Sequence, residues 1–260
     1  MIDTGEGPTV ILIPGIQGRW EWMREAVLAV GLKHRAISYS LCGESNTNLS
    51  IEPGLGFDNF TAQLDAIFER AQLRDVTLCG VSYGGLIAVR YAAKHPNRVR
   101  GLVLVSTPAP SWKPDERVKS YLRSPVLRLP LFAARSPSRL APEIVAAFPN
   151  LGDRITFTVR HTARVVSAPF SPTRMAERMR LLRTVDLERD CQKIHSPTLI
   201  ITGEPRLDRV VPVSSTQWYL KGIKHARSII FERTGHIGII SQPNRFAKII
   251  GSFVTEAQSL

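Results

Sequence analysis

The sequence predicts an α/β fold with a doubly wound, mostly parallel sheet and an inserted helical cap. Short β-branched runs alternate with amphipathic helical patterns, which is typical of α/β architecture. Most of these runs are apolar throughout, as expected for strands of a parallel sheet that helices cover on both faces. One long interval breaks the alternation, and it predicts the insertion.

Six segments have the composition of buried strands. They are residues 9–15, 34–41, 76–82, 100–106, 197–203 and 227–233. Helical patterns lie at residues 20–30, 58–72, 84–94, 214–221 and 243–255. In residues 58–72, apolar side chains recur three to four positions apart behind a candidate N-cap, Asp58.

The interval of residues 108–196 contains no convincing strand, and it holds ten prolines up to residue 172. Because proline usually ends a helix, we expect short helical pieces, such as 115–123, 142–148 and 172–183. An insertion at this point overhangs the carboxyl ends of the strands, where ligands bind in such sheets. We therefore expect a core of residues 1–107 and 197–260, with a helical cap or lid of residues 108–196.

Composition narrows the classes of function. The 260 residues contain no apolar run of about 18 or more, so we expect no transmembrane helix. The start lacks the regions of a signal peptide, which favours the cytoplasm. Three cysteines argue against a disulfide framework, and without CxxC or HExxH we expect no metal.

The formal charge of +12 is unevenly spread, since residues 111–190 alone carry 15 basic and 8 acidic side chains. A solvated, arginine-rich face is the simplest interpretation, and attraction to an anionic substrate or a lipid surface is the alternative. Contact with a membrane surface is not favoured. No basic run interleaved with aromatic residues indicates nucleic-acid binding. The sequence does not determine the oligomeric state.

The stretch CGVSYGGL, residues 79–86, is the strongest signal for chemistry. Gly80, Ser82 and Gly84 match G-x-S-x-G, the pattern of a nucleophile on a sharp turn between a strand and a helix. The predicted strand before Ser82 and the predicted helix after it supply that context. The helix would also aim its N-terminal amides at the site, which favours negative charge there. The alternative is a glycine-rich turn with a structural serine.

A serine nucleophile needs a base, and the base needs an orienting acid. His236 is our candidate base, because its loop follows the last predicted strand and can reach the same sheet edge. Asp208, a few residues after the strand 197–203, is the candidate acid, with Glu204 as the alternative. The chain order Ser82, Asp208, His236 is the one expected for this kind of sheet.

An oxyanion hole needs two preorganised backbone donors. The amide of Tyr83, next after the serine, is one candidate. The loop LIPGIQGRW after the first predicted strand supplies the other, and Ile16 is our choice. The alternative is that PGIQG forms only a turn.

Taken together, these segments resemble the α/β-hydrolase superfamily, in particular its capped, esterase-like members. The resemblance spans nearly the whole chain and rests on IPGIQG (13–18), GVSYGG (80–85), TGEPRLDRVVP (202–212) and TGHIG (234–238). It implies an α/β-hydrolase fold without a cofactor. Relatives usually carry His-Gly where this chain has Pro14-Gly15, and they often begin with an antiparallel hairpin. Only MIDTGEG precedes the first parallel strand here, so we expect a shorter sheet edge.

We therefore expect a serine hydrolase that cleaves a small-molecule carboxylic ester, lipid-like if the basic cap meets the substrate. The same triad also supports C–C bond, lactone or amide hydrolysis, acyl transfer and perhydrolysis, and a slow ligand receptor is the non-catalytic alternative. The candidate substrate contacts are Trp20, Trp22, Leu131, Phe132 and Phe148, for which packing of the cap on the core is the alternative.

Overall fold

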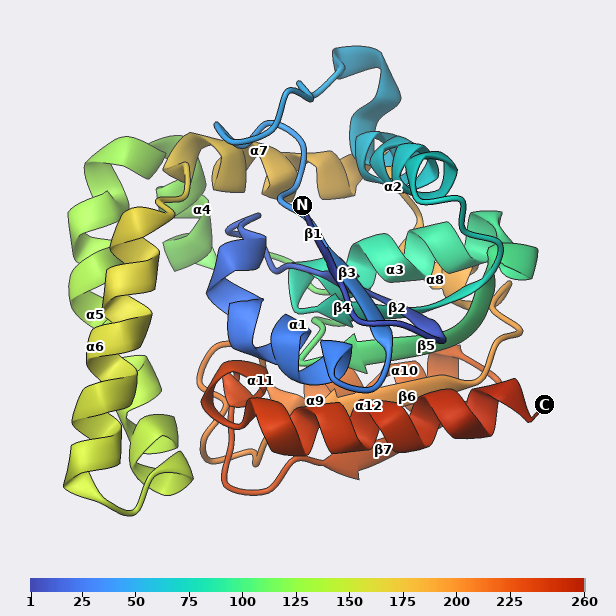
Figure 1. Cartoon of the computed structure of the whole chain (residues 1–260). Coiled ribbons are helices and arrows are strands. Elements are labelled where there is room, and N and C mark those ends of the chain that lie inside the picture. Colours follow the sequence, from blue (N-terminus) through green and yellow to red (C-terminus); the bar gives the residue numbers. More distant parts are fainter. Residues whose placement is uncertain (260) are drawn as a thin grey trace.

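A seven-stranded sheet forms the centre of the computed structural model, which describes residues 1–259 and the side chains of all of these except Arg117 and Phe132. The strand order is β1-β3-β2-β4-β5-β6-β7, and every neighbouring pair except β1 and β3 is parallel (Figure 1). The strands are β1 (Ile2–Thr4), β2 (Thr9–Ile13), β3 (Arg35–Ser38), β4 (Val76–Val81), β5 (Val99–Val105), β6 (Thr198–Thr202) and β7 (Ala226–Ile230). The predicted α/β fold is confirmed.

A single antiparallel strand, β1, forms the edge of the sheet where we expected less than the hairpin of relatives. It pairs antiparallel with β3, with Ile2 opposite Ser38 and Thr4 opposite Ala36. The chain turns back at Gly5, whose φ is +76°, and a Cβ there would lie 2.2 Å from the carbonyl oxygen of Gly31. Because only glycine fits that turn, the few residues before β2 can form an edge strand.

Helices cover both faces of the sheet. One face carries α1 (Arg24–Gly31), α11 (Gly238–Ser241) and α12 (Pro243–Gln258). The other carries α2 (Asn59–Arg70), α3 (Tyr83–Lys94), α8 (Leu187–Cys191) and α10 (Tyr219–Gly222). Shorter segments are η1 (Trp20–Met23), η2 (Pro53–Asp58), η3 (Pro96–Arg98), η4 (Leu182–Thr184) and α9 (Val213–Gln217). Successive residues of β4, such as Leu78 and Cys79, enter opposite cores, as the pleat of a strand requires.

Four helices between β5 and β6, here called the cap helices, lie beside the sheet. They are α4 (Glu116–Arg123), α5 (Pro125–Ala147), α6 (Leu151–Ser167) and α7 (Pro172–Leu181). In Figure 1, α5 and α6 run alongside each other at the left, and α7 crosses toward α2. The helix α8, which follows them, packs instead on α3 in the core.

The expectation of short helices between the prolines is wrong for α5. This helix continues for 23 residues through Pro130, Pro137 and Pro142. Each interior proline removes one N–H donor, while the Leu, Ala and Arg residues between them favour helix, so the helix continues. The 17-residue helix α6 was not predicted.

Candidate active site

Ser82 lies on a strained turn between β4 and α3. Its φ of 53° and ψ of −119° fall where residues other than glycine are rarely found. Close approach explains the flanking glycines, since a Cβ on Gly80 would lie 2.4 Å from the carbonyl oxygen of Gly84. A Cβ on Gly84 would in turn lie 2.3 Å from the carbonyl oxygen of Ile13. The sequence therefore folds into the predicted elbow, and strain of this kind is characteristic of functional positions.

Asp208 and His236 meet at the same edge of the sheet. Asp208 follows β6, His236 follows the neighbouring parallel strand β7, and Nδ1 of His236 lies 3.5 Å from Oδ2 of Asp208. Gly235 allows the two loops to touch, because a Cβ there would lie 2.5 Å from the carbonyl oxygen of Leu207. The parallel topology thus pairs the two side chains that the sequence nominated as base and acid.

The environment of Asp208 favours its charged form. The side chain is 1% exposed, and its Oδ1 accepts hydrogen bonds from the amides of Val210 (3.0 Å) and Val211 (2.9 Å). Burial opposes ionisation, but His236 and these amides together hold the pKa of Asp208 below its usual value. A carboxylate in this state can orient an imidazole and stabilise its charged form.

Glu204, the alternative acid, has other partners, and two further histidines lie far from Ser82. Glu204 accepts hydrogen bonds from the amide of Arg233 (2.7 Å) and from Nε of Arg206 (2.9 Å). His195 and His225 border a separate hollow at the other end of the strands. His236 and Asp208 are thus the candidate base and acid that meet at the carboxyl ends of the strands, where Ser82 lies.

The loop of residues 14–18 lies directly against the elbow. A Cβ on Gly15 would be 3.6 Å from Cβ of Ser82, and Ile16 lines the same pocket as Ser82. Tyr83 is the first residue of α3, and amides in the first turn of a helix have no partner within the helix. The two predicted oxyanion donors therefore flank the serine.

A buried arginine of the cap helices, which no sequence motif indicated, contacts this loop. Arg178 of α7 donates through Nη1 to the carbonyl oxygen of Ile16 (2.9 Å) and through Nη2 to Oε1 of Glu44 (2.7 Å). The Tyr83 hydroxyl donates to the carbonyl oxygen of Arg178 (2.8 Å). Glycine at position 18 makes room for the Arg178 side chain, since a Cβ there would lie 2.6 Å from its guanidinium nitrogens. No sequence pattern indicates this contact, because 134 residues separate Glu44 from Arg178.

An apolar pocket of about 230 Å³ opens at Ser82. The helices α4, α5 and α7 supply much of its wall. The cap residues that line it include Val118, Tyr121, Leu122, Leu129, Met175, Ala176 and Met179, and core residues include Leu86 and Val211. Among the side chains that the structure describes, no Asp, Glu, Lys or Arg lines this pocket.

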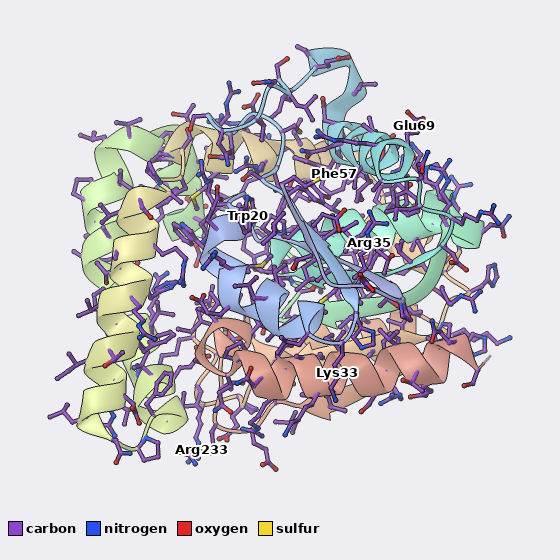
Figure 2. All side chains as sticks on the ribbon, in the orientation of Figure 1. Trp20, Lys33, Arg35, Phe57, Glu69 and Arg233 are labelled. Carbon is purple, nitrogen blue, oxygen red and sulfur yellow. The ribbon has the colours of Figure 1, made fainter. Side chains whose placement is uncertain are left out.

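Four of the predicted substrate contacts, Trp20, Trp22, Leu131 and Phe148, are not among the described residues that line the pocket. Trp22 lies behind its wall, with Nε1 donating to the carbonyl oxygen of Ala168 (3.0 Å) and its ring packed edge-on against Phe170. Leu131 is 37% exposed, and Phe148 packs on Phe157. Trp20 lies in η1 beside the cap helices (Figure 2). The side chain of Phe132 is outside the described part. Residues of α4 and α7 line the pocket in place of these four, because of how the two helices pack on the core, which the sequence does not reveal.

The part of the chain that matches known proteins includes the whole of this candidate site. A profile of the α/β-hydrolase fold matches residues 8–243. The chain belongs to the α/β-hydrolase fold family. Within the described residues, no helix is long and apolar enough to cross a membrane, and no group of three His, Cys, Asp or Glu side chains could hold a metal ion.

Relatives in this family are hydrolases of several kinds. A pimeloyl-[acyl-carrier protein] methyl ester esterase of Nitrosomonas europaea is 25% identical over an alignment of 254 residues that covers 94% of this chain and 94% of that one. A 2-hydroxy-6-oxo-2,4-heptadienoate hydrolase of Pseudomonas putida is 26% identical over 261 residues, covering 97% of this chain and 91% of that one. These relatives support a hydrolase activity for the chain.

Solved structures share the fold over nearly the full length. The enol-lactonase of Burkholderia xenovorans matches with a TM-score of 0.79 at 21% identity, covering 98% of this chain and 95% of that one. A thermophilic esterase of Thermogutta terrifontis matches with a TM-score of 0.79 at 20% identity, covering 98% and 92%. At such identities the likeness establishes the architecture.

Proposed function

We propose that the chain is a serine hydrolase that cleaves carboxylic esters through an acyl-enzyme. The observation that carries this proposal is the pairing of His236 with Asp208 at the sheet edge where Ser82 occupies a strained turn beneath an apolar pocket. Nucleophile, base and orienting acid are the three groups that acyl transfer to a hydroxyl requires.

In the proposed reaction, Ser82 Oγ attacks the acyl carbon while His236 accepts the hydroxyl proton. The amides of Ile16 and Tyr83 stabilise the negative charge that develops on the carbonyl oxygen. When the bond to the alcohol breaks, His236 donates its proton to the leaving oxygen. Water then attacks the acyl-enzyme, His236 accepts the water proton, and the carboxylic acid leaves as Ser82 recovers its hydrogen.

The pocket favours an uncharged, apolar acyl group. A carboxylate buried among the described lining side chains would find no cationic partner, which costs several kcal/mol. The positive charge of residues 111–190 lies outside this lining, so it does not argue for an anionic acyl group. This disfavours a carboxylate substrate such as the dienoate for which the Pseudomonas putida relative is named.

A graded panel of p-nitrophenyl esters tests the proposal. We expect turnover that rises from acetate toward medium-length acyl chains and disappears in Ser82→Ala. Turnover by Ser82→Ala within tenfold of the wild-type rate would contradict it. Product analysis with competing alcohols separates hydrolysis from acyl transfer, and a lactone and an amide substrate test those reaction classes. Labelling of Ser82 by a fluorophosphonate without turnover of any ester would favour the slow receptor.

A further inference from the structure

A carboxylate from the cap helices is buried beside His236. Glu143 of α5 is 1% exposed, and both of its oxygens accept a hydrogen bond from the amide of Ile237, at 3.0 Å for Oε1 and 3.1 Å for Oε2. Ile237 directly follows His236, and 94 residues separate it from Glu143. The contact therefore joins a cap helix to the backbone of the loop that carries the proposed base.

We propose that Glu143 is a positioning residue for His236, through which the docking of α5 sets the orientation of the imidazole. This inference rests on the proposed function. The Asp208 oxygen lies 3.5 Å from Nδ1 of His236, which is longer than a normal hydrogen bond, so this contact does not fix the ring by itself. The position of the ring then depends on the backbone, and Glu143 fixes the residue next to it.

Two other contacts tie α5 to the same sheet edge, and both come from exposed arginines. Nε of Arg233 donates to the carbonyl oxygen of Ala146 (2.9 Å), and Nη1 of Arg209 donates to that of Ser138 (3.4 Å). Figure 2 shows Arg233 at the lower end of the cap helices, near the edge of the molecule. Of these three contacts, only the hydrogen bond of Glu143 is buried. A hydrogen bond to a charged group is stronger when it is shielded from water, so this contact should hold the loop most firmly.

The carboxyl group of Glu143 also has a pKa near neutral pH. Burial raises the pKa of Glu143 to about 7, while the amides of Ile237 and Gly235 oppose this rise. Two charged groups act on it from the neighbouring loops, since His236 lowers this pKa and Asp208 raises it. Arg233 and Arg209 reach the backbone of the same helix. Above neutral pH the ionised carboxylate holds the Ile237 amide firmly, and protonation weakens that hold.

The test compares Glu143→Gln with wild type in kcat and KM for p-nitrophenyl butyrate between pH 5 and 9. We expect kcat to fall about 10- to 100-fold with KM changed less than about twofold, because displacement of a catalytic group slows chemistry more than binding. The acid limb of log kcat against pH should be steeper than unit slope in wild type, because loss of the Glu143 proton strengthens the hold on the Ile237 amide, in addition to the deprotonation that general-base catalysis itself requires. It should fall to unit slope in Glu143→Gln.

Matched variants keep the test decisive. Glu116→Gln removes a carboxylate that is 78% exposed on α4 and should leave kcat and slope unchanged. Glu143→Asp keeps the carboxylate, so it should retain the steep acid limb of log kcat against pH, with a kcat between those of wild type and Glu143→Gln. It also serves as the test variant if Glu143→Gln does not fold. A wild-type kcat and slope in Glu143→Gln, or a unit slope in Glu143→Asp, would overturn the inference. Loss of the proposed function itself would appear separately, as activity retained by Ser82→Ala.

Discussion

Arg178 and Glu44 form a salt bridge of 2.7 Å in which the side chains are 0% and 1% exposed. Arg178 belongs to a cap helix and Glu44 to the loop after β3, so this pair fastens α7 to the core. The same guanidinium also donates to the carbonyl oxygen of Ile16, beside the proposed oxyanion donor. The buried guanidinium of Arg178 therefore contributes both to the docking of the cap helices on the core and to the geometry of the proposed site.

Removal of either partner should strongly destabilise the chain. Arg178→Met leaves Glu44 charged and buried without its partner, and Glu44→Gln does the same to Arg178. We expect each to lower the free energy of unfolding by about 3–5 kcal/mol, measured by urea denaturation. The double variant should recover part of this loss, because two neutral side chains need no ion partner. Single variants within about 0.5 kcal/mol of wild type would show that the pair has no such role.

The proposed triad predicts a graded loss of kcat. Asp208→Asn should lower kcat by about 10⁴-fold, because the amide favours the wrong imidazole tautomer, and His236→Gln and Ser82→Ala should each cost about as much or more. Combining Ser82→Ala with His236→Gln should add little, since the groups act as a unit. Ser252→Ala, at an exposed position of α12, is the control. Additive losses in the double variant would contradict a shared mechanism.

The lining of the pocket predicts how acyl-chain preference can be changed. Ala176 of α7 is buried and lines the pocket, so Ala176→Leu should shorten the space for the acyl chain. We expect kcat/KM for the octanoate ester to fall at least about tenfold more than that for acetate, because a single methylene is worth about 1–3 kcal/mol in such a pocket. Leu131→Phe, on the exposed side of α5, should leave the ratio unchanged. An equal loss for both esters would place the acyl chain elsewhere.

Glu143 predicts an unusual dependence of stability on pH. Its folded pKa of about 7 lies above the ordinary value of 4.5, so the folded state holds this proton longer than the unfolded chain. Stability should therefore fall as pH rises from about 4.5 to 7, by at most about 3 kcal/mol. Glu143→Gln should lack this fall and be more stable than wild type at pH 8, although we expect it to be slower. Parallel curves of unfolding free energy against pH for the two proteins would contradict this assignment.

The elbow at Ser82 could be predicted because its determinants are local in the sequence. Gly80 and Gly84 are needed where β4, Ser82 and α3 pack closely, and all of them lie within one short stretch. His236 and Asp208 could be nominated because parallel strands place their carboxyl ends at one edge. In each case a local pattern, combined with one rule of sheet topology, was sufficient.

By itself, the sequence determined the α/β fold, the strained turn at Ser82 and the nomination of His236 and Asp208 as its partners. Only the tertiary structure decided which side chains form the pocket, and it paired Arg178 with Glu44 and Glu143 with Ile237. The reason is physical. Amphipathic cap helices carry more apolar positions than one pocket can use, so the lining depends on how each helix docks. Buried polar contacts between segments about 100 residues apart leave no periodic pattern in either segment.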